Sequence, residues 1–184
     1  HAFSQAEGHV NGYAAWSGSG LFTLPLGNGT KRGHLALTGT CGARFKAAYF
    51  RGDPASATLP AGAPFARTNL AAGLQAVSNV EYWDLDGAAP TAITLHFDAQ
   101  SNLQALAGEA SRLTLIAWDG SRWVDLGNAS FSGALSTGGT LTSNPVIPDQ
   151  YRAFTFGVRV PNCSYQLLSP SGTDQQSLCL NSAL

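Results

Sequence analysis

Two aspartates stand two positions apart in a segment with the alternating pattern of a β-strand. Asp84 and Asp86 therefore point to one face of that strand, together with Tyr82. Two carboxylates that face a cleft can hydrolyse a glycosidic bond, and with Asp98 and backbone carbonyls they could form a calcium site. The simpler interpretation, which we favour, is a polar outer face that leads into the turn at Gly87.

One carboxylate is expected on the other, buried side of the same segment. Glu81 alternates with Trp83 and Leu85, which are apolar. A buried carboxylate needs a partner, and either Arg51 or Arg44 could supply it. We expect a structural ion pair here rather than a catalytic acid.

The histidines show no metal-ligand spacing on any one strand; they are His1, His9, His34 and His96. An N-terminal histidine can bind copper through its amine and its ring, as in the copper-dependent polysaccharide mono-oxygenases. His1 begins the chain, but the residues after it do not resemble that family. The sequence also has no Gly-x-Ser-x-Gly nucleophile elbow. We therefore expect no cofactor and no enzymatic activity, with copper chemistry at His1 as a minor alternative.

Three aromatic residues have the chemistry of a sugar-stacking platform. They are Tyr82, Trp118 and Trp123. The two tryptophans flank an Asp119-Gly120 turn and should face each other across a hairpin. Exposed on one face, the three rings would bind a glycan; buried, they would serve packing alone.

The chain has three cysteines, an odd number that leaves one thiol without a partner. A Cys163–Cys179 bridge would close a loop of about 16 residues and contribute about 3 kcal/mol in an oxidising compartment. A Cys41–Cys163 bridge, or pairing of Cys179 with a cysteine further along a longer chain, stays open. We favour Cys163–Cys179, with Cys41 buried and free.

The composition sets limits on the partners of the chain. It has 184 residues, of which 11% are charged, and a net charge of −1. Phosphate neutralisation and polybasic attachment to membranes both need many more cations, so we expect no nucleic-acid binding. No run of 18 apolar residues occurs, so we expect no membrane insertion. The polar, weakly charged remainder favours an extracellular protein.

The elements that position these residues are almost all strands. Helical patterns are weak and confined to 102–110 and 68–74. Apolar alternation, interrupted by Gly, Pro, Asn or Asp every eight to twelve residues, predicts an antiparallel β-sandwich of about 10 strands, jelly-roll or immunoglobulin-like. The expected strands are 9–15, 21–26, 33–39, 43–51, 76–85, 91–98, 112–118, 121–126, 129–135, 139–143 and 151–160. The expected domain is 1–160, and 161–184 reads as a linker followed by the start of another repeat or by an exchanged strand.

Six stretches in order resemble a module of the very large secreted surface proteins of Bacteroidetes, gliding and adhesin-like proteins exported by type IX secretion. These stretches are 8–13, 21–30, 48–50, 77–85, 118–124 and 153–157. Residues 176–184 look like the opening strand of the immunoglobulin-like repeats that follow in such proteins. The sorting domain that type IX export needs is not in this sequence, which suggests an excerpt of a longer protein.

The resemblance implies a β-sandwich display module at the cell surface and brings no catalytic motif. We therefore expect a non-enzymatic structural module for adhesion, display or fibre assembly. Its expected partners are neighbouring domains or copies of the same protein, joined by strand addition through 1–6 or 177–184. The alternative is a carbohydrate-binding module that recognises surface glycans through Tyr82, Trp118 and Trp123.

Overall fold

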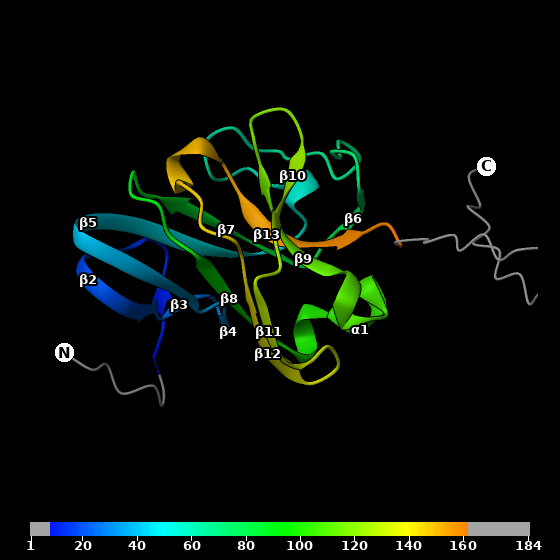
Figure 1. The fold of residues 1–184 in the computed structure, drawn as a ribbon, viewed down its shortest axis with the longest axis horizontal. Helices are drawn as coiled ribbons and strands as arrows, with labels where there is room; N and C mark the ends of the chain where they lie inside the picture. The colour runs from blue at the N-terminus through cyan, green and yellow to red at the C-terminus, as the bar shows by residue number, and fades with distance from the viewer. Residues whose placement is uncertain (1–7, 162–184) are drawn as a thin grey trace, which may run out of the picture.

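The computed structural model describes residues 8–161, and these residues form mainly β-strands (Figure 1). The strands are β1 (Val10–Asn11), β2 (Ala14–Leu24), β3 (Leu26–Asn28), β4 (Lys31–Arg32), β5 (Leu35–Arg51), β6 (Leu74–Val77), β7 (Glu81–Asp86), β8 (Ile93–Asp98), β9 (Leu113–Trp118), β10 (Trp123–Gly127), β11 (Ser130–Ala134), β12 (Gly138–Thr142) and β13 (Phe154–Arg159). One short helix, α1 (Leu103–Ala107), and four 3₁₀ turns, η1 (Pro54–Ser56), η2 (Ala99–Ser101), η3 (Ala110–Arg112) and η4 (Pro148–Gln150), connect them. No helix in the range 8–161 is long and apolar enough to cross a membrane.

A ten-stranded sheet forks at β5 and so forms two layers (Figure 1). β2 pairs along one side of β5. On the other side, Leu35–Leu37 of β5 pair with β8, and residues 46–51 pair with β7. One layer then runs β8-β12-β11 and the other β7-β13-β9-β10, with β6 added to β13. A small sheet, β1-β3-β4, lies beside them. The predicted all-β sandwich, dominated by antiparallel pairing, is confirmed.

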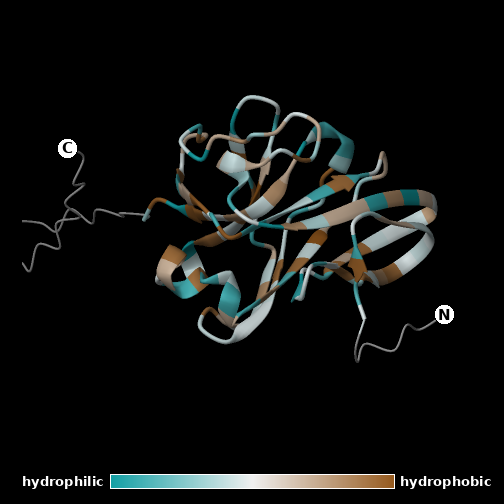
Figure 2. Cartoon of the chain, turned by 180° about the vertical axis from the view of Figure 1, so that it is seen from behind, coloured by the Kyte–Doolittle hydropathy of each residue, from teal (hydrophilic) through white to brown (hydrophobic). Residues whose placement is uncertain are grey.

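The main core lies between the two layers, and we call it the inner core. It follows the predicted alternation, which Figure 2 shows as apolar residues recurring along the strands. Every second residue of the central strands is fully or almost fully buried in it: Trp83 and Leu85 of β7, Ile93, Leu95 and Phe97 of β8, and Phe154, Phe156 and Val158 of β13. Burial of such side chains contributes about 1.5–3 kcal/mol each before conformational entropy is subtracted.

A second cluster, the outer core, lies on the opposite face of the β7-β13-β9-β10 layer. Phe65 is fully buried at its centre and packs on residues that point away from the inner core: Leu74, Val77, Tyr82, Ile116, Trp118, Trp123 and Ala153. The long connection between β5 and β6 supplies Phe65 and covers this face. Both faces of the β7-β13-β9-β10 layer therefore carry buried apolar side chains.

Several predicted boundaries are wrong. Segments 33–39 and 43–51 are one 17-residue strand, β5, which continues through Gly42 at φ +81°. Segment 9–15 contains β1 and the start of β2, segment 21–26 contains the end of β2 and the start of β3, and β2 runs on between them through 16–20 with a register shift between Gly18 and Gly20. Segment 76–85 divides into β6 and β7, with residues 78–80 between them. Segment 68–74 is not a helix, and 102–110 contains only the five residues of α1. Residues 162–184, most of the expected appendage, lie outside the described residues.

Candidate functional site

The three aspartates proposed for a calcium site are not brought together. Asp84 accepts a hydrogen bond from the Tyr13 hydroxyl at 2.6 Å, and burial raises the pKa of its carboxyl. Asp86 forms an exposed ion pair with Lys46 at 2.9 Å. Asp98 accepts from the backbone N–H of Gln100 at the start of η2. Within residues 8–161 no three His, Cys, Asp or Glu side chains converge as metal ligands. The reason is topological, since β7 and β8 pair with opposite ends of β5.

The sugar-stacking platform is contradicted by burial. Tyr82 and Trp118 are only 5% and 7% exposed, and Trp123 is fully buried. The predicted hairpin is confirmed, with Trp123 opposite Trp118 and ring centroids 5.6 Å apart. Tyr82 donates its hydroxyl to the carbonyl of Leu59 at 2.8 Å, and burial raises its pKa to about 12. These rings belong to the outer core, beneath Phe65, and have no face to offer a glycan.

The buried ion pair at Glu81 is confirmed, with Arg51 as the partner at 3.4 Å. Tyr49 donates its hydroxyl to the same carboxylate oxygen at 2.7 Å. Burial raises the pKa of Glu81, and the hydroxyls of Ser101 and Tyr49 and the charge of Arg51 oppose that shift. The Arg51 guanidinium also donates to the carbonyl of Gln100 at 2.6 Å. The cluster thus ties β5 and β7 to η2.

Two histidines come together in a way that single-strand spacing could not predict. The rings of His34 and His96 lie 5.9 Å apart, edge to face, because β5 and β8 are neighbours. Burial lowers the pKa of both imidazoles. His1, the copper candidate, lies outside the described residues. So do Cys163 and Cys179. Cys41 is exposed rather than buried, and it forms no disulfide within the described residues.

A cleft of about 570 Å³ lies beside Trp16, an aromatic residue that the sequence analysis did not select. Arg44, Lys46 and Asp86 also line it. The ring of Trp16 stacks on Phe22 with centroids 3.5 Å apart. It also lies so close to Gly18 and Gly39 that a Cβ at either position would come within 2.7 Å of a ring carbon. Because Phe22 and the two glycines cover the Trp16 ring, the cleft offers no free aromatic face on which a sugar could stack.

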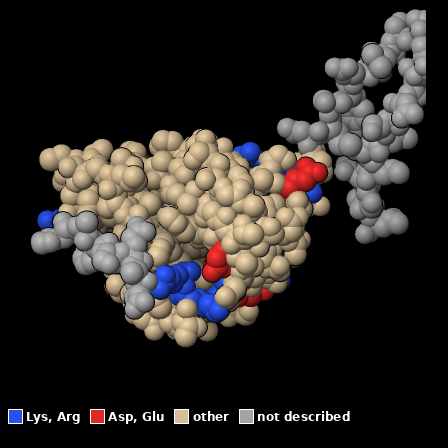
Figure 3. All heavy atoms as spheres, turned by 90° about the horizontal axis from the view of Figure 1, so that it is seen from below, with Lys and Arg blue, Asp and Glu red and all other residues tan. Residues whose placement is uncertain are grey.

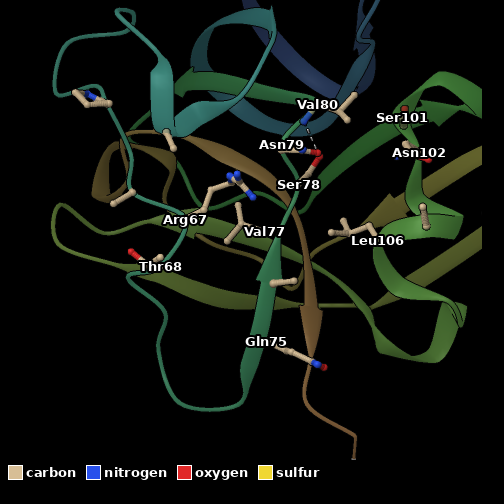
Figure 4. A pocket seen from close by; sticks show the side chains of 15 residues that line it. Arg67, Thr68, Gln75, Val77, Ser78, Asn79, Val80, Ser101, Asn102 and Leu106 are labelled. Carbon is tan, nitrogen blue, oxygen red and sulfur yellow. Dashed lines mark hydrogen bonds between the residues drawn. The ribbon is translucent and has the colours of Figure 1, made fainter. Parts of the chain in front are cut away.

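A groove of about 620 Å³ with a floor and two walls lies at the edge of β6 (Figure 4). Its volume lies within the roughly 300–1,000 Å³ typical of ligand pockets. Its floor is 75–80, which contains most of β6 and the link to β7. One wall is Ala55, Pro64, Ala66, Arg67 and Thr68, and the other is Ser101, Asn102, Ala105 and Leu106. In Figure 4, Arg67 and Thr68 lie on one side of β6, and Asn102 and Leu106 lie on the other.

The floor of this groove is an unpaired strand edge. Within the described part of the chain, β6 pairs with β13 alone. Ser78 donates its N–H to Phe156 of β13 at 2.9 Å. Because successive residues of a strand direct their backbone groups to opposite sides, Val77 presents its N–H and C=O to the groove. The groove therefore offers backbone hydrogen bonds between two walls, as peptide-binding sheet edges do. Sequence periodicity could not show it, because it depends on where β5 ends.

The molecular surface around these features carries few charges. Figure 3 shows a face on which basic and acidic side chains are sparse and most of the area is uncharged. This agrees with the 11% of charged residues in the sequence.

Comparison of the chain with models of protein families, with curated proteins and with solved structures gives no match.

Proposed function

We propose that this chain is a non-enzymatic structural module of a secreted or cell-surface protein. In this proposal it acts in adhesion, display or fibre assembly and joins copies of itself by strand pairing. The groups best suited to catalysis are engaged internally: Glu81 with Tyr49 and Arg51, and Asp84 with Tyr13. The six stretches whose sequence resembles Bacteroidetes surface proteins and the low charge of the chain support the extracellular setting.

The observation that carries the proposal is the edge of β2. This strand has eleven residues, none of them charged, and within residues 8–161 it pairs with β5 alone. Natural proteins protect such edges with lysines, prolines or bulges, because free N–H and C=O groups recruit further strands. β2 has only the register shift at Gly18 and Gly20. Leu21 is 77% exposed on this strand.

The first test places a charge on this edge. Leu21→Lys should weaken self-association at least about tenfold, a loss of about 1.4 kcal/mol, because a lysine disfavours strand pairing at an edge. Leu59→Lys is the matched control: Leu59 is 58% exposed but lies in the connection that covers the outer core. The measurement is sedimentation velocity over a concentration series of the full chain.

The outcomes separate clearly. Self-association of the unmodified chain and of Leu59→Lys, but not of Leu21→Lys, supports pairing through β2. A chain that stays monomeric to its solubility limit, or equal association of all three proteins, overturns the proposal.

A further inference from the structure

We propose that residues 177–184 of this chain dock in the groove beside β6 of the same molecule, as an added strand. This inference concerns a different edge from β2 and does not depend on self-association. It assigns an occupant to the groove, and it gives the segment a role within the molecule that carries it.

The groove is a gap in the sheet left by β5. β5 pairs with β7 as far as the pair Arg51 and Glu81, and then the chain turns away, with the N–H of Gly52 bonded to the carbonyl of Val80. β6 continues the line of β7 along β13, but among residues 8–161 it has no neighbour on the β5 side. A strand laid there would continue the sheet where β5 leaves it.

The walls suit an extended segment with medium-sized apolar side chains. A strand in the groove directs alternate side chains to opposite walls. Both walls are lined by small residues, including Ala55 and Ala66 on one side and Ala105 on the other. Small wall residues leave room for larger incoming ones. In 177–184, Leu178 and Leu180 alternate with residues that are smaller or polar.

The charge of the groove also suits residues 177–184. Among the described residues that line the groove, Arg67 alone is charged, and it already pairs with Asp53 at 3.0 Å. An anionic ligand would therefore compete with an existing carboxylate, whereas an uncharged segment would not. Residues 177–184 contain no charged side chain.

The last described residues lie next to the start of β6, at one end of the groove floor. Val160, just after β13, donates its N–H to the carbonyl of Gly73, next to the first residue of β6. Crossing from β13 to the far edge of β6 requires about 10 Å, two strand spacings. The fifteen residues 162–176 can reach across at most about 50 Å, well beyond this distance. A covalent connection of this length raises the effective concentration of 177–184 at the groove, which favours docking within one molecule.

The test is disulfide trapping in the full chain. Cys41→Ser and Cys163→Ser leave Cys179 as the only native thiol, and Ala105→Cys or Ala66→Cys adds a thiol to one wall or the other. Ala88→Cys is the control, because Ala88 is exposed and lines the separate Trp16 cleft. We expect mild oxidation to yield an intramolecular disulfide with one of the two walls and none with Ala88→Cys, as read by non-reducing electrophoresis and peptide mass mapping.

Hydrogen exchange supplies a test without added thiols. In the unmodified chain the Val77 amide should be protected, and Leu178→Asp with Leu180→Asp should speed its exchange at least about tenfold. Leu167→Asp with Leu168→Asp makes the same change in the linker and should leave that rate unaltered. Equal trapping at all three cysteines, disulfides only between molecules, or exchange of Val77 that ignores the Leu178 and Leu180 changes would overturn the assignment. Sedimentation of the β2 variants is unaffected by these results, so the two proposals fail separately.

Discussion

The inner and outer cores flank the same layer of strands, but they are built differently. The inner core is closed by two sheet layers, and nearly all its members come from strands with regular alternation. The outer core is closed by one connection, in which Phe65 contacts rings that a two-layer sandwich would leave facing water. Ring centroids of Phe65 lie 5.8 Å from Trp118, 6.2 Å from Trp123 and 6.3 Å from Tyr82. Phe65 and the residues of the same connection that pack around it, Ala57, Ala63, Ala66 and Leu70, therefore leave these aromatics no free face for a ligand.

The comparison also shows where local stability should differ. Strand pairing on both sides holds the inner core, and its loss requires separation of the layers. The connection over the outer core is attached by fewer bonds, among them those of Asn69 and Ala71 to the backbone of Trp123. We expect the outer core to open without global unfolding, since regions with fewer buried contacts open at lower free energy.

The largest expected effect follows from a change in the inner core. Trp83 is fully buried, donates its indole N–H to the carbonyl of Gly33 at 2.8 Å, and packs edge to face on Phe156 at 5.6 Å. Trp83→Ala should lower the free energy of unfolding by about 3–5 kcal/mol, because it leaves a cavity and an unpaired carbonyl. Urea denaturation followed by far-UV circular dichroism measures this loss. A loss below about 1 kcal/mol would contradict the inner core as described.

The next effect should be confined to the outer core. Phe65→Ala should cost about 3 kcal/mol, the lower end of the range for buried phenylalanines, because the connection can settle into the space. Tryptophan fluorescence should shift to the red as Trp118 and Trp123 meet water, while far-UV circular dichroism stays native. Leu59→Ala, in the same connection but exposed, serves as the control. Loss of strand signal together with the red shift would show that the two cores unfold as one.

Much of the fold could be predicted from sequence, because the inner core follows period-two alternation. Ile93, Leu95 and Phe97 share a face as expected, and the pairing of Trp118 with Trp123 follows from the turn between them. The outer core could not be predicted. Phe65 stands in a segment rich in alanine and proline with no periodicity, so nothing local indicates that it covers a sheet.

The candidate sites likewise divide into those that the sequence could predict and those that it could not. The partner of Glu81 could be anticipated, because a buried carboxylate next to a strand with Arg51 has few alternatives. The separation of Asp84 from Asp98 and the groove beside β6 depend on which part of β5 each neighbour meets. That register is a long-range property, set by the fork of the sheet, and single-strand patterns do not contain it.

The smallest expected effect concerns the polar cluster at the margin of the inner core. Burial raises the pKa of Glu81 above its ordinary value of 4.5, so the folded state holds this proton more tightly than the unfolded state. Its contribution to stability is therefore full below pH 4.5 and is lost as the pH rises through the folded pKa. Glu81→Gln removes that titration. The free energy of unfolding of the native chain minus that of the variant should decrease as the pH rises across this window.

The stability change caused by Glu81→Gln distinguishes a carboxylate that is stabilised by its ion pair from one whose burial only costs free energy. At neutral pH Glu81→Gln should change stability by only about 1 kcal/mol, because the amide oxygen can still accept from Tyr49 while the charge on Arg51 loses its partner. Tyr49→Phe is the control: it removes a donor that lowers the pKa of Glu81, so it should keep the pH dependence and displace it to higher pH. Denaturation midpoints in urea at pH values from acid to neutral give both comparisons. If Glu81→Gln and the native chain follow parallel curves, the pKa of Glu81 is the same in the folded and unfolded states, and its partners offset the cost of burial; a difference that increases with pH would mean that Arg51 and Tyr49 hold the carboxylate more strongly than burial opposes it.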